Sequence, residues 1–137
     1  MYTVNIWPII VAAVVSFAIG ALWYSPILFG KEWMALTKIS EADMAAAKAK
    51  GVWKSYIVHF IANLISFAVL GFIIVAVGVQ SGSDGAFFGF LVWLGFTLPL
   101  HISHLLWQKA PMKLILIDTV QVLIGLVIGG AIIGAWR

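Results

Sequence analysis

Residues 114–136 read LILIDTVQVLIGLVIGGAIIGAW, an almost unbroken apolar stretch. A helix needs about 20 apolar residues to cross about 30 Å of hydrocarbon, so this stretch is long enough to span a bilayer. Residues 4–24, 53–79 and 86–107 have similar length and the same apolar character. The sequence therefore predicts an all-α integral membrane protein, a single domain of residues 1–137 in which four transmembrane helices form a bundle.

The composition also indicates a membrane environment. Hydrophobic residues make up 64% of the chain and charged residues 9%. A soluble domain is about half apolar and about a quarter charged, and a chain this short cannot bury such an excess within itself. Helices are expected because lipid offers backbone polar groups no partner. The expected partner is the lipid bilayer; no basic helix or aromatic–basic pattern predicts nucleic-acid binding.

The long connection between the first two spans, residues 27–52, carries helix signals. Residues 40–43 combine a serine cap with acids in the first turn, and an alanine-rich run then continues to Gly51. Further upstream, three large apolar residues at i, i+4 and i+7 fall on one helix face. These are Phe29, Trp33 and Leu36. The connection is therefore expected to contain a short interfacial or cytoplasmic helical segment.

The placement of lysine predicts the orientation. Seven lysines lie in or beside the 27–52 connection and the connection near residue 110, whereas residues 80–85 have none and Arg137 ends the chain. Those lysines are Lys31, Lys38, Lys48, Lys50, Lys54, Lys109 and Lys113. Cytoplasmic loops carry the excess of positive residues, so the 27–52 connection is expected in the cytoplasm and both termini outside.

Six polar side chains inside the predicted spans are the candidate site. They form three pairs at i, i+3 or i+4 spacing, so each pair shares a helix face. Counted from the flanking lysines at 1.5 Å per residue, the first tier lies ~7 to 8 Å inside the cytoplasmic boundary and the second one turn deeper. The pairs are His59 with Asn63, His101 with His104, and Asp118 with Gln121. Polar groups in spans usually face the bundle interior, which predicts a cavity that opens to the cytoplasm.

This pattern admits several functions. The cavity would bind or transport a small molecule, an ion or protons, for which histidine has a suitable pKa. The same residues could instead only cross-link helices through hydrogen bonds. Three histidines and a carboxylate could also chelate zinc, although their spacing matches no recognised signature, so a metal stays open. An alternative function is a non-catalytic scaffold that uses its lysine-rich connection for lipid or a partner.

Two further features concern helix shape and packing. Pro99 lies inside the third span, cannot donate to the carbonyl of Gly95, and is expected to kink that helix. Small residues recur every four positions in the fourth span, where they allow close backbone approach. They predict either packing within the chain or a homodimer, through Gly125, Gly129, Gly130 and Gly134. No nucleotide loop, catalytic triad or nucleophile elbow is present, so neither catalysis nor a cofactor is expected.

The segments GALWYSP (residues 20–26) and LFGKEWM (residues 28–34) resemble the signature of a bacterial membrane family called domain of unknown function 1761. WLGF (residues 93–96) and KLILID (residues 113–118) match as well. The resemblance covers nearly the whole chain. It implies a small four-span protein of the bacterial inner membrane with no assigned activity, and it provides no catalytic residues to transfer.

Overall fold

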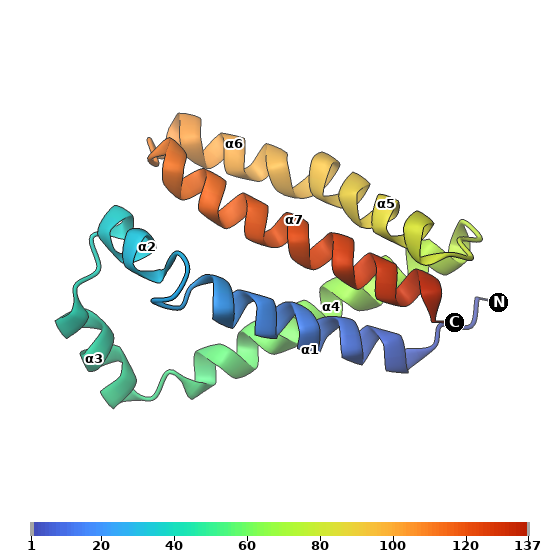
Figure 1. Ribbon diagram of the computed structural model, residues 1–137, viewed down its shortest axis with the longest axis horizontal. Helices are drawn as coiled ribbons and strands as arrows, with labels where there is room; N and C mark the ends of the chain where they lie inside the picture. The colour runs from blue at the N-terminus through green and yellow to red at the C-terminus, as the bar shows by residue number, and fades with distance from the viewer. Residues whose placement is uncertain (1, 137) are drawn as a thin grey trace.

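The computed structural model describes residues 2–136, which contain helices and turns but no strand (Figure 1). Four of its helices are long and apolar enough to cross a membrane, and each corresponds to one of the expected stretches. They are α1 (Ile6–Trp23), α4 (Trp53–Ala76), the continuous helix Gly82–Trp107 and α7 (Met112–Ala135). The predicted all-α fold with four long apolar helices is confirmed.

The connection between α1 and α4 is helical, as the sequence predicts. It contains α2 (Gly30–Thr37) and α3 (Glu41–Lys50). At the start of α3, the Asp43 backbone N–H donates to Ser40 Oγ at 3.0 Å and the Ser40 N–H donates to the Asp43 carboxylate at 2.9 Å. The bond from the Ser40 N–H lowers the pKa of Asp43 below its ordinary value. The cap is therefore complete at neutral pH and weakens as the pH falls through that lowered pKa.

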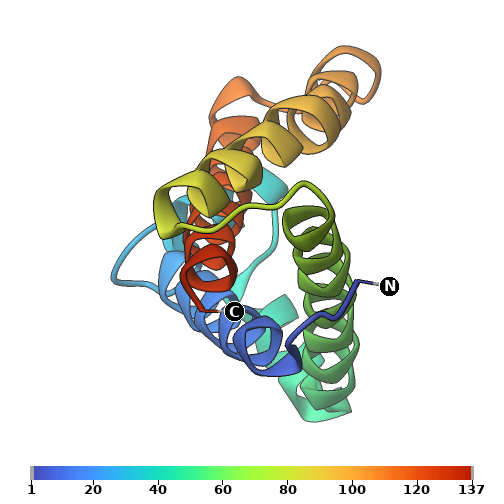
Figure 2. The same ribbon diagram turned by 90° about the vertical axis from the view of Figure 1, so that its right-hand side faces the viewer.

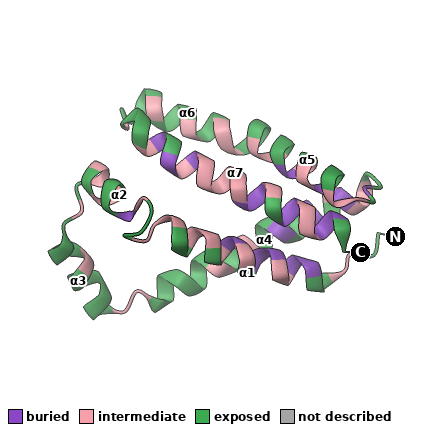
Figure 3. Ribbon diagram, viewed as in Figure 1, coloured by how far each residue is buried: buried purple, intermediate pink, exposed green. Residues whose placement is uncertain are grey.

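Helix α7 lies at the centre of the arrangement. Viewed from the end that carries the termini, α1 and α4 lie on one side of α7 and α5 (Gly82–Val92) on the other (Figure 2). The buried core lies where these helices meet, and it includes Phe67 and Ile74 of α4 (Figure 3). Toward the opposite end, α4 diverges from α6 (Leu98–Trp107), which packs on α7 (Figures 1 and 2).

Two helix boundaries differ from the expected ones because of local capping. The third long helix begins at Gly82, earlier than residue 86, because the Ser81 side chain accepts a hydrogen bond from the Asp84 backbone N–H at 3.1 Å. Much of the polar stretch 80–85 is therefore helix. Helix α4 ends at Ala76, before residue 79, because Gly78 adopts a positive φ of 75° that is incompatible with continuation.

The third long helix accommodates Pro99 through a π-helical turn. This turn, η1 (Trp93–Thr97), joins α5 to α6, and the Leu98 N–H bonds to the carbonyl of Trp93. Pro99 then occupies the first turn of α6, where its missing N–H is tolerated. The predicted irregularity at Pro99 thus takes the form of a π-helical turn on its N-terminal side.

The glycines of α7 are covered by other helices of the same chain. A Cβ on Gly130 would collide with the Gly85 carbonyl of α5, and one on Gly129 would enter the ring of Phe67. A Cβ on Gly125 would lie 2.7 Å from Ser16 Oγ of α1. Close approach of backbones in lipid depends on such small residues. Within the chain the glycines therefore act in packing, and a second chain would reach them only if α1, α4 and α5 moved.

Gly89→Ala should destabilise the fold, because its Cβ would collide with the Leu126 carbonyl of α7. Overpacking of this kind costs roughly 1–3 kcal/mol. Gly95 is the matched control, since no atom lies within 4 Å of a Cβ built there. Thermal unfolding followed by circular dichroism in detergent should give a lower Tm for Gly89→Ala than for Gly95→Ala. Equal Tm values would show that the contact between α5 and α7 is not close.

Candidate functional site

The six predicted site residues lie on three helices that differ in their packing. His59 and Asn63 are on α4, and the two predicted histidines of the third span are on α6. Asp118 and Gln121 are on α7, which lies between these two helices (Figure 2). Since α4 and α6 diverge toward this end of the molecule, each pair has its own surroundings within the chain.

Asp118 and Gln121 are partly buried and face α1. The Tyr24 hydroxyl, one residue beyond α1, donates a hydrogen bond to Asp118 Oδ1 at 2.7 Å. Gln121 lies against Gly20, where an added Cβ would lie 3.3 Å from its amide nitrogen. This pair therefore connects α7 to α1. A cross-link between helices through hydrogen bonds was one of the interpretations that the sequence allowed, and the bond from Tyr24 to Asp118 is of this kind.

The pair on α4 is more open. His59 is exposed, and its ring lies 5.9 Å from the ring of Phe17 in α1, measured between centroids. Asn63, one turn deeper, is half-buried. A shallow, open depression adjoins His59 and is lined by Lys54, Ser55, Val58, His59 and Ala62. None of the other predicted site residues lines it.

The pair on α6 is also largely uncovered. His101 is half-buried, and its Nδ1 lies 3.0 Å from the Thr97 carbonyl, so Nδ1 carries the hydrogen of this bond. The Thr97 carbonyl, which accepts this bond, lies at the end of the π-helical turn. His104 is exposed, with its ring centroid 6.1 Å from that of His101. Across residues 2–136, no three side chains of His, Asp or Glu gather as a metal site would require.

Sequence reasoning did not anticipate the tight junction between α1 and α2. Two backbone bonds close this turn, from the Phe29 N–H to the Trp23 carbonyl and from the Gly30 N–H to the Ser25 carbonyl, both 2.9 Å. Gly30 is buried, and a Cβ there would collide with the Tyr24 carbonyl. These residues belong to the motif of residues 20–34, so the motif encodes a compact turn.

The turn is attached to α7 through side chains. The Trp23 indole N–H donates to the Ile117 carbonyl at 3.0 Å, next to the bond between Tyr24 and Asp118. Lys113 forms an ion pair of 2.9 Å with Glu32 of α2. The segments 20–34 and 113–118, which carry the family resemblance separately, therefore meet in the fold. The sequence does show side chains that can form hydrogen bonds in both segments, namely Trp23 and Tyr24 in one and Asp118 in the other. Sequence alone could not indicate that these two segments meet.

A second tryptophan contacts α7 two residues further along. The Trp93 indole N–H, from η1, donates to the Thr119 carbonyl at 2.8 Å and approaches Thr119 Oγ1 at 3.1 Å. Thr119 is buried. Indole N–H groups from two different helices thus fix α7 at neighbouring carbonyls, which positions the polar start of this helix.

The end of the molecule that contains α2 and α3 is strongly basic. Seven exposed lysines lie there, against three acidic residues in α2 and α3. Both the α1–α4 and the α6–α7 connections are at this end, opposite the termini (Figure 1). The lysines are Lys31, Lys38, Lys48, Lys50, Lys54, Lys109 and Lys113. Lys113 is the one that forms an ion pair within the described chain.

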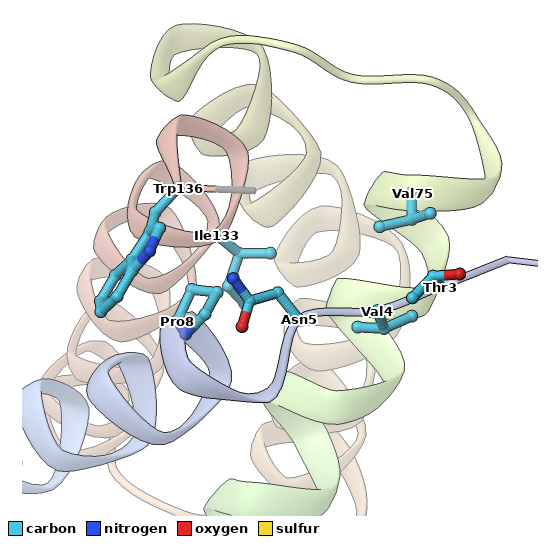
Figure 4. A pocket seen from close by; sticks show the side chains of 7 residues that line it. All are labelled: Thr3, Val4, Asn5, Pro8, Val75, Ile133 and Trp136. Carbon is cyan, nitrogen blue, oxygen red and sulfur yellow. The ribbon is translucent and has the colours of Figure 1, made fainter.

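The opposite end contains a small cavity of about 120 Å³ (Figure 4). It lies between the start of α1 and the ends of α4 and α7, and its lining is mainly apolar. Its residues are Thr3, Val4, Asn5, Pro8, Val75, Ile133 and Trp136. The Asn5 side chain caps α1 by accepting from the Trp7 N–H at 3.1 Å. The Asn5 carboxamide in this cavity thus already has a structural role.

The model of a protein family described as "Protein of unknown function (DUF1761)" matches residues 7–134. Comparisons with curated proteins and with solved structures found no match. The function must therefore be argued from the geometry of this chain.

Gly30→Ala should open the junction between α1 and α2, because the added Cβ collides with the backbone of the turn. Limited trypsin digestion should then cut after Lys31 several-fold faster than in the unmodified protein. Cleavage after Lys48 and Lys50 of α3 is the internal control and should not change. If cleavage after Lys31 stays at its original rate, the turn does not depend on close approach at Gly30.

Proposed function

Because this chain belongs to the DUF1761 family of proteins of unknown function, we propose from its own geometry that it is a multi-pass membrane protein that binds anionic lipid headgroups through its lysine-rich end. The observation that carries the proposal is the gathering of seven exposed lysines at one end of four apolar helices. Each lysine near an anionic membrane surface contributes about 1 kcal/mol of attraction.

The surroundings of the lysines support a headgroup site. Helix α2 is attached to α7 by the pair of Lys113 with Glu32, so it is held close to the ends of the long helices. Its aromatic residue Trp33 packs on Tyr24 with ring centroids 5.8 Å apart. Tryptophan and tyrosine favour the membrane interface, which supports a position of α2 at headgroup level. The lysines of α2 and α3 would then lie beside lipid phosphates.

The same distribution supports an orientation with the lysine-rich end in the cytoplasm and both termini outside, in a bacterial inner membrane. Under this arrangement α3 projects toward the cytoplasm. Its first turn is acidic and its last turn is basic, which suits the helix dipole. Lys48 and Lys50 lie in that last turn, just before α4 begins at Trp53, so they add to the positive surface at headgroup level.

A small-molecule or ion site at the six polar residues is the second candidate. It is favoured by the polar pairs that the chain leaves open on α4 and α6. It ranks below lipid binding because Asp118 and Gln121 contact α1, and the depression at His59 contains one of the six residues. Alanine at His59 and His104 would disrupt a ligand site there while leaving lipid preference unchanged.

Neutralising the lysines should remove the lipid preference. A variant with Lys31, Lys38, Lys48 and Lys50 replaced by glutamine should lose, by more than about tenfold, the preference for phosphatidylglycerol over phosphatidylcholine. Native mass spectrometry of the protein in detergent with both lipids measures this. The matched control replaces the same four residues by arginine, which keeps the charge, and should keep the preference. An unchanged preference in the glutamine variant would contradict the proposal.

The orientation has its own test, because the chain contains no cysteine. Ser83 is exposed at the start of α5, on the end that carries the termini. Ser83→Cys should react with a membrane-impermeant maleimide in intact spheroplasts, whereas Ala45→Cys in α3 should react only after lysis. The reverse pattern would refute the orientation.

A further inference from the structure

The two least covered long helices carry the uncovered polar residues. In their most apolar 18-residue windows, 22% of α4 and 11% of the helix Gly82–Trp107 are buried, against 39% of α7. His59 on α4 and His104 on α6 are exposed, and Asn63 and His101 are partly so. Ionisable groups in spans are costly when they face lipid and are usually covered by protein. These two helix faces therefore need an occupant that hydrogen-bonds.

The occupant must contact both α4 and α6, because these two helices do not cover each other's polar residues. Helix α6 packs on α7 and the turn before it, while α4 packs mainly on α1 and α7. The two helices diverge toward the lysine-rich end (Figures 1 and 2). Lipid chains lack hydrogen-bond groups, so they cannot satisfy imidazole or amide side chains.

We propose that a second copy of this chain is the occupant, with α4 of each copy against α6 of the other. His59 is five residues from Lys54 and His104 is five from Lys109, so both lie at the same depth, ~7 to 8 Å from the lysine level at 1.5 Å per residue. Asn63 and His101 form the next tier. A two-fold axis along the membrane normal preserves depth, so it brings His59 opposite His104 of the second copy.

The chemistry of the two faces is complementary. A neutral imidazole has one donor and one acceptor, and a side-chain amide has both. His59 can therefore pair with His104 of a second copy, and Asn63 with its His101. An isologous interface makes each contact twice, so a single dimer covers all four polar positions of both copies. The surface differs from the glycines of α7, which α1, α4 and α5 cover within the chain.

The oligomeric state of the full chain tests this inference, which is independent of lipid binding. Native mass spectrometry and Förster transfer between labelled copies in liposomes, over a range of protein-to-lipid ratios, should show a dimer. The double variant His59→Phe with His104→Phe should raise the dissociation constant at least tenfold. His59→Gln with His104→Gln keeps donors and acceptors and should retain the dimer. Ser66→Ala, also on α4, should have no effect because the Ser66 hydroxyl donates to the Ala62 carbonyl.

Cross-linking locates the contact even if the phenylalanine variant fails to fold. Copies with His59→Cys are mixed with copies with His104→Cys and oxidised, and a disulfide between the two is expected. Val14 of α1 is also exposed on the surface of the chain, and Val14→Cys mixed with His104→Cys should not cross-link. A protein that is monomeric at all densities, with or without retained phospholipid, would overturn the inference. So would a dimer that cross-links through Val14 and not through His59.

Discussion

Every side-chain hydrogen bond between long helices in residues 2–136 ends on α7. Trp23 and Tyr24 at the end of α1 bond to Ile117 and Asp118, and Trp93 bonds to Thr119 from the other side. The ion pair with Glu32 of α2 ends on α7 as well. In lipid there is little hydrophobic drive for helices to associate, so such bonds and close backbone contact determine the arrangement. Helices α1, α2 and the continuous helix Gly82–Trp107 are placed by their contact with this one helix, whereas α4 packs mainly on α1.

The glycines make these bonds possible. Gly130 lies against Gly85, so α5 and α7 approach until their backbones touch. At that separation Trp93, further along the same continuous helix, reaches the Thr119 carbonyl. On the other side, Gly20 leaves room for Gln121. Small residues and polar side chains thus depend on one another, since larger residues at the contacts would hold the indole and phenol groups out of reach.

Much of this fold could be predicted from local signals. The four spans follow from apolar length, and the start of α3 follows from Ser40, because a capping serine acts on residues next to it in sequence. Counting from the lysines also gives a depth in the membrane for the candidate site, and this depth stays a prediction. The order of helices around the bundle could not, because α7 lies between α4 and α6 for reasons of tertiary packing. For the same reason the sequence could not reveal that Tyr24 is the partner of Asp118.

The two indole bonds have a mechanical consequence for α7. Trp23 and Trp93 hold carbonyls two residues apart from two different helices, so α7 cannot rotate about its axis or slide without breaking both bonds. Helix α4 has no such constraint in the described chain, because its side chains contact α1 and α7 through apolar groups such as Phe67 and its one side-chain hydrogen bond is internal. The register of α4 depends on shape instead, because the ring of Phe67 fills the space over Gly129 of α7. The molecule therefore combines a frame of α1, α5 and α7, held by hydrogen bonds to α7, with one helix, α4, that among the described residues is held by apolar packing alone.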